Sequence, residues 1–82
     1  MNATAPSPRP ETHKGKLAMP YEVGIIKPDS TSRNYYFVTL EDAASFARGA
    51  AQMSRDRVFI YRYTSKKPWG YFEQLQALND NA

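Results

Sequence analysis

The sequence predicts a small α+β domain in which one helix packs on one face of an antiparallel sheet, in the order ββαββ. Three observations support this prediction. Short segments rich in aromatic and β-branched residues recur along the chain, one alanine-rich segment has helical spacing, and short polar turns separate the strand segments. We expect a single domain at residues 20–78, between a disordered basic tail (1–19) and a frayed C-terminus (79–82).

The size and composition of the chain limit what it can be. Its 82 residues include no cysteine, which excludes a disulfide framework and a thiolate metal site. The N-terminus lacks the apolar region of a secretory signal, and no apolar run approaches the roughly 20 residues that span a bilayer. We therefore expect a soluble cytoplasmic protein that does not contact a membrane.

The first 19 residues differ from the rest in composition. They contain Pro6, Pro8 and Pro10 among small polar residues, and nothing repeats at helix or strand spacing. Such a segment buries too little apolar surface to offset its ordering entropy. It is predicted to be disordered alone, either as a basic arm that folds on a partner or as a passive tail.

The first two strands are predicted to form a hairpin. Tyr21–Lys27 places Val23 and Ile25 on one face of a strand, and Arg33–Thr39 is rich in aromatic and β-branched residues. Residues 28–32, which combine proline, aspartate and serine, form the connecting loop. A connection this short favours antiparallel pairing.

The predicted helix begins after Thr39. The sequence TLED at 39–42 resembles a capping box, and its two acids lie where the helix dipole favours negative charge. The helix is expected to end near Ser54. Its apolar stripe consists of residues at helical spacing, namely Ala43, Phe46, Ala47, Ala50 and Met53.

The C-terminal third begins with a third strand at Arg57–Tyr63, followed by a turn at 65–68. The segment Trp69–Leu78 is ambiguous. Its first residues favour a strand, whereas the spacing of residues 72, 75 and 78 is helical. We predict a short strand that ends near Gln74 and then frays.

The segment 55–71 is the strongest candidate for a contact surface. It contains five basic residues, five aromatic residues and one acid, whereas residues 21–82 as a whole carry eight basic and seven acidic residues. A concentrated patch on a nearly neutral domain is typical of a binding site, although surface lysine and arginine also serve solubility. The predicted contact residues are Tyr61, Arg62, Tyr63, Lys66, Lys67, Trp69 and Tyr71.

One helix, about 10 Å across, cannot cover a four-stranded sheet nearly 20 Å wide. Strand alternation leaves two arrangements open. If Val58 and Ile60 face the helix, the other face carries up to seven aromatic side chains, from Tyr35, Phe37, Phe59, Tyr61, Tyr63, Trp69 and Tyr71. With the opposite parity, Phe37, Phe59 and Tyr61 form the core. Periodicity does not separate the two, because both faces are apolar.

The chain offers little catalytic chemistry. Its one histidine, His13, lies in the predicted tail, and there is no Ser/His/Asp arrangement, phosphate loop or paired Cys/His spacing. The adjacent acids Glu41 and Asp42 are explained by the helix start. We therefore predict a protein that is not an enzyme and uses neither cofactor nor metal.

Three functional interpretations follow. The first is a regulator or inhibitor that binds a larger protein partner, because tyrosine, tryptophan and arginine favour interface centres. Its size and composition are those of many phage or mobile-element regulators, by analogy alone. The alternative is a module that binds single-stranded nucleic acid, with aromatic rings stacking bases and cations following phosphates. The third is a homodimer that buries the uncovered face.

Overall fold

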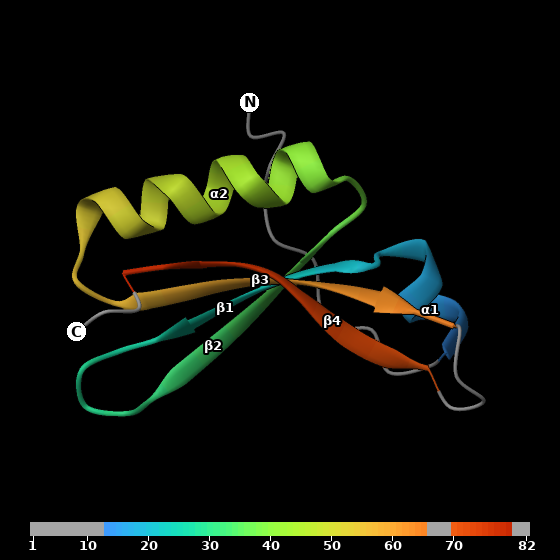
Figure 1. Ribbon diagram of the computed structural model, residues 1–82, viewed down its shortest axis with the longest axis horizontal. Helices are drawn as coiled ribbons and strands as arrows, with labels where there is room; N and C mark the ends of the chain where they lie inside the picture. The colour runs from blue at the N-terminus through green and yellow to red at the C-terminus, as the bar shows by residue number, and fades with distance from the viewer. Residues whose placement is uncertain (1–12, 66–69, 80–82) are drawn as a thin grey trace.

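The protein is a four-stranded antiparallel sheet with one long helix across one face (Figure 1). The computed structural model describes residues 13–65 and 70–79. The order of the strands in the sheet is β2-β1-β3-β4. The elements are α1 (His13–Ala18), β1 (Tyr21–Ile26), β2 (Ser32–Phe37), α2 (Leu40–Met53), β3 (Arg57–Thr64) and β4 (Tyr71–Leu78). The predicted fold class and the antiparallel β1–β2 hairpin are confirmed.

The hydrophobic core lies between the two central strands and α2. Val23 of β1 and Val58 and Ile60 of β3 are at most 1% exposed, and Ala43 and Ala47 of α2 are fully buried. Alanine at these positions lets the helix axis approach the sheet closely, so the larger strand side chains fill the space between them. Full burial of each valine or isoleucine contributes roughly 1.5–3 kcal/mol.

Strands β2 and β3 present opposite classes of side chain to the helix. In β3 the aliphatic Val58 and Ile60 face α2. In β2 the aromatic Tyr35 and Phe37 face it, and their rings lie 4.8 Å and 5.3 Å from the ring of Phe46. Neither of the two uniform arrangements expected from the sequence is therefore correct. The register explains this, because Val23 pairs with Tyr35 on one side and with Ile60 on the other.

The helix begins as predicted, and its apolar stripe ends earlier. Thr39 is the N-cap, and its hydroxyl oxygen accepts a hydrogen bond from the backbone N–H of Asp42 at 3.2 Å. At the other end, the Ser54 hydroxyl donates to the carbonyl of Ala50 at 2.9 Å. Met53, predicted to extend the stripe, is 88% exposed and does not contribute to the core.

The last strand is longer than predicted. β4 pairs with β3 as far as Leu78, which lies opposite Val58 and packs against the core. An irregularity in the pairing between Ile60 and Tyr61 shifts the register along β4. Both the helical alternative for this segment and the fraying after Gln74 are therefore wrong, because pairing with β3 outweighs the local helical spacing.

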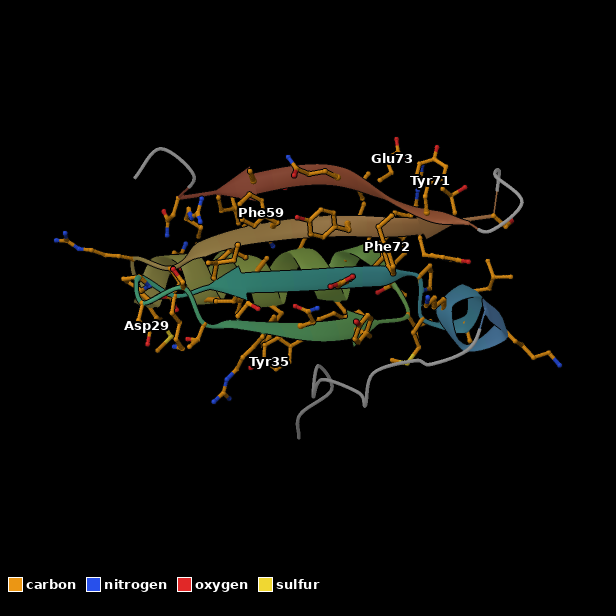
Figure 2. All side chains as sticks on the ribbon, turned by 90° about the horizontal axis from the view of Figure 1, so that it is seen from below. Asp29, Tyr35, Phe59, Tyr71, Phe72 and Glu73 are labelled. Carbon is orange, nitrogen blue, oxygen red and sulfur yellow. The ribbon has the colours of Figure 1, made fainter. Side chains whose placement is uncertain are left out.

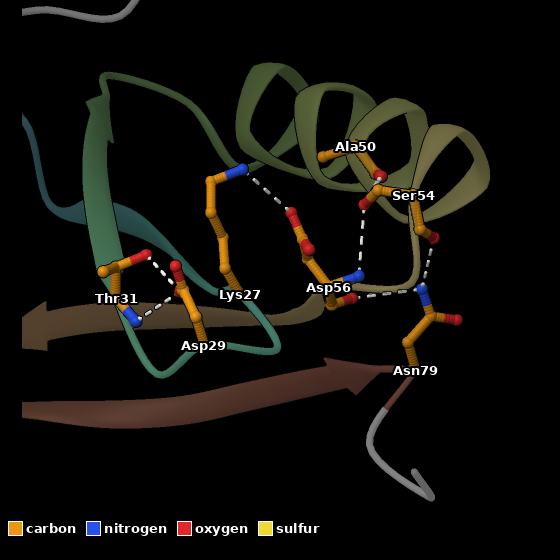
Figure 3. A network of polar contacts seen from close by, with 7 residues as sticks. All are labelled: Lys27, Asp29, Thr31, Ala50, Ser54, Asp56 and Asn79. Carbon is orange, nitrogen blue, oxygen red and sulfur yellow. Dashed lines mark hydrogen bonds and ion pairs between the residues drawn. The ribbon is translucent and has the colours of Figure 1, made fainter.

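A side-chain amide attaches the end of β4 to the end of α2 (Figure 3). Asn79 has a left-handed backbone (φ 58°). Its Nδ2 lies 3.0 Å, 3.3 Å and 3.2 Å from the carbonyl oxygens of Ala51, Ser54 and Asp56. The first two carbonyls belong to the C-terminal end of α2 or follow it, where backbone acceptors lack helical partners. Of the four residues predicted to fray, Asn79 makes these contacts, and residues 80–82 lie outside the described part of the chain.

The loop between β1 and β2 is closed by an aspartate turn (Figure 3). The Asp29 carboxylate accepts hydrogen bonds from the backbone N–H of Thr31 at 3.0 Å and from its hydroxyl at 2.7 Å. These bonds lower the pKa of Asp29 below its ordinary value. Next to this loop, the Lys27 ammonium lies 3.5 Å from the buried Asp56 carboxylate and so connects the loop to the start of β3.

A short helix precedes the first strand. α1 occupies residues 13–18, for which the sequence predicted no regular structure. The chain then joins the sheet through the carbonyl of Pro20, which accepts a hydrogen bond from the backbone N–H of Tyr63 at 2.7 Å. α1 therefore lies at one end of the sheet, near the end of β3 (Figure 1). The rest of the predicted tail, residues 1–12, lies outside the described residues.

Candidate binding surface

The face of the sheet that points away from α2 is the candidate binding surface, and we call it the open face. Figure 2 looks onto it, with α2 behind the sheet and Phe59 and Phe72 on the near side. Within residues 13–65 and 70–79, α1 borders this face at one end and no other helix packs on it. The register assigns to it Glu22, Gly24, Ile26, Ser32, Asn34, Tyr36, Arg57, Phe59, Tyr61, Tyr63, Phe72, Gln74 and Ala77.

Two aromatic pairs form one side of the open face. Phe59 and Tyr61 stack with ring centroids 6.3 Å apart and an interplanar angle of 28°. Tyr63 and Phe72 meet edge to face at 5.1 Å, because β3 and β4 place them opposite each other. Tyr63 is buried, whereas Phe59, Tyr61 and Phe72 are half-buried and keep part of their rings available for contact.

Phe59, Tyr61, Tyr63 and Phe72 together form an aromatic row. A lysine from α1 lies at one end of it. The ammonium of Lys16 lies 5.5 Å from the centre of the Tyr63 ring and 5.9 Å from that of Phe72. Both distances are within the range of cation–π attraction. α1 thus brings a positive charge to one end of the open face.

Gly70, directly before β4, lies against the ring of Tyr63. Gly70 has a left-handed backbone (φ 75°), and a methyl group placed there would overlap the hydroxyl and ring of Tyr63. The position therefore requires glycine for two reasons, the backbone angle and the close approach of the ring.

A shallow groove crosses the centre of the open face. It has a volume of about 330 Å³ and runs along β1 between Asn34 of β2 and the rings of Phe59 and Tyr61. Gly24 forms its floor. A β-carbon at Gly24 would lie 3.7 Å from Cε2 of Tyr61 and 3.8 Å from Oδ1 of Asn34, so a side chain at this position would occupy part of the groove.

The carboxylate-bearing residue of the groove is Glu22. It lies between Tyr36 and Tyr61 in the register and is only 8% exposed. Burial of a carboxylate is costly unless it is hydrogen-bonded or paired with a positive charge. Glu22 does interact within the chain, and it places a carboxyl group among the aromatic and small side chains that line the groove.

The structure separates the contact residues predicted from the sequence. Tyr61 and Tyr63 lie together on the open face, whereas Arg62 and Tyr71 alternate to the side of α2. Tyr71 lies along the outer edge of β4 (Figure 2). The remaining predicted contacts, Lys66, Lys67 and Trp69, lie outside the described residues.

Arg62 is engaged in an ion pair. Its guanidinium donates to the carboxylate of Glu73 on β4 at 2.9 Å, and both side chains are 43% exposed. The hydrogen bond and the charge of Glu73 raise the pKa of Arg62 above its ordinary value. This pair lies away from the groove, so the arginine expected to anchor a partner is not part of the open face.

Sequence reasoning missed the residues that shape the groove: Glu22, Gly24, Asn34 and Phe72. One signal was available, since a glycine within a strand often marks close approach of another group. The others needed the register. Glu22 lies in a predicted strand, and its burial depends on its neighbours Tyr36 on β2 and Tyr61 on β3.

The described side chains contain no site with metal-binding composition. In residues 13–65 and 70–79, no three histidine, aspartate or glutamate side chains are close enough to hold a metal ion. No helix in the part of the chain that the structure describes is long and apolar enough to cross a membrane. Comparisons with protein-family models, curated proteins and solved structures found no match to this chain.

Proposed function

We propose that this chain is a small non-enzymatic binding protein, a regulator or inhibitor acting in the cytoplasm, that engages a larger protein partner through the open face. The observation that carries the proposal is the groove over Gly24, which combines aromatic walls with a buried carboxylate. Apolar surface with a few fixed polar groups is the usual composition of a specific recognition site.

The aromatic side chains support a protein partner. Phe59, Tyr61 and Phe72 are half-buried and therefore already fixed in position by their neighbours. A partner that covers them loses little further side-chain entropy, which is one of the main costs of association. Aromatic residues are enriched at the centres of protein interfaces for this reason and for their large contact area.

The distribution of charge also supports a protein over a nucleic acid. A nucleic-acid strand lying along the groove would bring its phosphates near the carboxylate of Glu22 at the centre of the face. Among the residues that the structure describes, Lys16 beside Phe72 and Arg57 opposite Ile26 bring positive charge to the two ends of the face. Recognition driven by phosphate contacts favours a continuous positive path instead.

Single-stranded nucleic acid remains the second candidate because of one observation. The stacked pair of Phe59 and Tyr61, 6.3 Å apart, offers rings on which exposed bases could stack. Titration of a fluorescently labelled single strand at increasing salt tests it. Affinity that falls steeply with salt and is lost in Phe59→Ser would favour this candidate, whereas weak, salt-independent binding would eliminate it.

The decisive experiment fills the groove without removing any of its side chains. Gly24→Val adds three carbon atoms over the floor of the groove at a strand position that valine favours. Immobilised wild-type and variant proteins are exposed to cell lysate with and without nuclease treatment, and captured proteins are quantified by mass spectrometry. The matched control is Met53→Ala, which alters an exposed apolar side chain on α2.

We expect Met53→Ala to capture the same partner as the wild type and Gly24→Val to lose it, with equal far-UV circular dichroism for all three. Capture that survives Gly24→Val, or that disappears after nuclease treatment, would contradict the proposal. Sedimentation at several concentrations separates self-association from binding of a different protein. A dimer that Gly24→Val converts to a monomer would show that the open face binds a second copy.

A further inference from the structure

We propose that α2 forms a second contact surface, on which the α2 helix of a second copy of this chain packs in antiparallel orientation. The contact uses a groove on the surface of this helix, which we call the α2 groove. α2 and the open face lie on opposite sides of the sheet (Figure 2), so this inference goes beyond the proposed function and does not depend on it. The residues that line the α2 groove are Ser45, Phe46, Gly49, Ala50 and Met53.

The α2 groove is largely apolar and has a volume of about 330 Å³. Phe46 forms one wall, and its ring is packed 4.8 Å from the ring of Tyr35 and 5.3 Å from that of Phe37. Met53, at the C-terminal end of the groove, is 88% exposed although its side chain is apolar. A helix that covers this surface would remove apolar groups from water, which favours association.

Gly49 lies midway along the α2 groove and marks the place where a second helix can come closest. Glycine destabilises the interior of a helix relative to alanine. The packing of the described residues does not require it, because a β-carbon at this position would meet nothing within 4 Å. Two helices approach more closely where the residues between them are small. The position therefore fits a point at which two helices cross.

The distribution of charge along α2 indicates that the occupant is a second copy in antiparallel orientation. The first turn carries Glu41 and Asp42, and Arg55 and Arg57 follow the end of the helix. Each copy is therefore negative before the α2 groove and positive after it. Antiparallel packing brings opposite charges together at both ends, whereas parallel packing would bring like charges together.

Asp42 and Arg55 are the charged pair that this arrangement predicts. Asp42 lies seven residues before Gly49, and Arg55 lies six residues after it. When two α2 helices cross at Gly49, Asp42 of one copy therefore comes near Arg55 of the other, and twofold symmetry forms this pair twice. Within the described part of the chain, neither Asp42 nor Arg55 takes part in an ion pair, so both charges are available.

The test measures self-association of the full chain by sedimentation equilibrium up to millimolar concentration. We expect a reversible dimer with a dissociation constant on the order of 100 µM, because a contact of one helix per copy is small. This dimer is dissociated at the micromolar concentrations used for unfolding. In ¹⁵N-labelled protein, the amide shifts of Ser45, Gly49 and Met53 should change with concentration.

Gly49→Leu is the decisive variant. Leucine favours the helix and has space in the single chain, so the variant should fold at least as well as the wild type by circular dichroism. Its side chain would separate the two helices, so the dimer should weaken by at least tenfold. Gly24→Val is the control, because it fills the groove of the open face and should leave this dimer unchanged.

Charge reversal tests the antiparallel orientation. Asp42→Arg and Arg55→Asp should each weaken the dimer by about fivefold, because each replaces two attractive pairs by repulsive ones. The double variant restores opposite charges and should recover the affinity of the wild type to within about twofold. A Thr39→Ala variant, which loses the N-cap but keeps both charges, should dimerise as the wild type does if it remains folded.

Several results would overturn the proposal. They are a chain that stays monomeric at millimolar concentration, a dimer unaffected by Gly49→Leu, and a double charge reversal that does not restore affinity. A dimer lost in Gly24→Val, with shifts at Gly24 and Phe59, would place self-association on the open face instead. Lysate capture lost in Gly49→Leu by a monomeric wild type would show that the α2 groove binds another protein. None of the results that concern Gly49 bears on capture through the open face, so the two proposals fail separately.

Discussion

Removal of the Asn79 side chain is the sharpest test of how β4, and with it part of the open face, is held in place. Its amide approaches three carbonyl oxygens at 3.0–3.3 Å at the C-terminal end of α2 and the start of β3. Asn79→Ala removes these contacts and also places alanine in a left-handed backbone conformation (φ 58°), where its β-carbon is sterically unfavourable. Asn79→Gly removes the same contacts and tolerates the backbone angle, so the two variants separate the two effects.

The magnitude follows from the geometry. Nδ2 carries two hydrogens shared among three acceptors, so the loss is about two hydrogen bonds, each worth roughly 0.5–1.5 kcal/mol. Because Asn79 is exposed, we expect about 1–2 kcal/mol for Asn79→Gly. Alanine in a left-handed conformation costs roughly a further 1 kcal/mol, which gives about 2–3 kcal/mol for Asn79→Ala. A folded part of about 60 residues has a total stability of roughly 3–9 kcal/mol, so either loss is measurable.

Urea unfolding followed by far-UV circular dichroism measures both variants. With a slope near 1 kcal/mol per molar urea, typical of a small domain, the midpoint should fall by about 1–2 M for Asn79→Gly and 2–3 M for Asn79→Ala. An unchanged midpoint for both would show that the amide contributes nothing to stability. Equal midpoints for the two variants would refute the role assigned to the left-handed backbone.

Four further predictions concern positions in the helix, the core and the turns. Gly49→Ala should stabilise the protein by about 0.5–1 kcal/mol, because Gly49 is inside α2 and a β-carbon there meets nothing within 4 Å. Gly70→Ala should lower the melting temperature, because the added methyl group would overlap the ring of Tyr63. Ile60→Ala should cost about 2–5 kcal/mol, since the side chain is 1% exposed, whereas Met53→Ala, at 88% exposed, should leave the urea midpoint unchanged. Asp29 has a lowered pKa, so its hydrogen-bonded turn contributes stability above pH 3.8 that is lost as the pH falls through the folded-state value; a carboxyl ¹³C titration with its midpoint at or above 3.8 would contradict this.

The aromatic side chains of the open face are only partly exposed to solvent. Tyr63 is covered by neighbouring groups, and its contacts with Phe72 and Gly70 fix the end of the aromatic row. Only part of the row therefore remains exposed around the groove. In the proposed binding function, such a groove would contribute specificity through its shape and its few polar groups.

Local signals in the sequence determined the elements and their order. Thr39 and the acids after it define the start of α2, because an N-cap satisfies backbone donors within its own turn. The spacing of Ala43 and Ala47 identified the side of the helix that is buried. The β1–β2 hairpin followed from the short connection between two strand-forming segments. Each of these depends on residues close together in the chain.

Only the tertiary structure decided which side chains share a face. Val23 pairs with both Tyr35 and Ile60, and these pairs fix which residues of β1, β2 and β3 face α2. The same pairing brings Glu22, Gly24 and Asn34 together with the rings of β3 on the other face. The same is true of β4, which continues to Leu78 because β3 supplies its hydrogen-bonding partners. The sequence alone identified Tyr61, Arg62 and Tyr63 as contact candidates, and the register divides them between the two faces of the sheet. A strand's alternation has two equivalent phases, and only its neighbours in space choose between them.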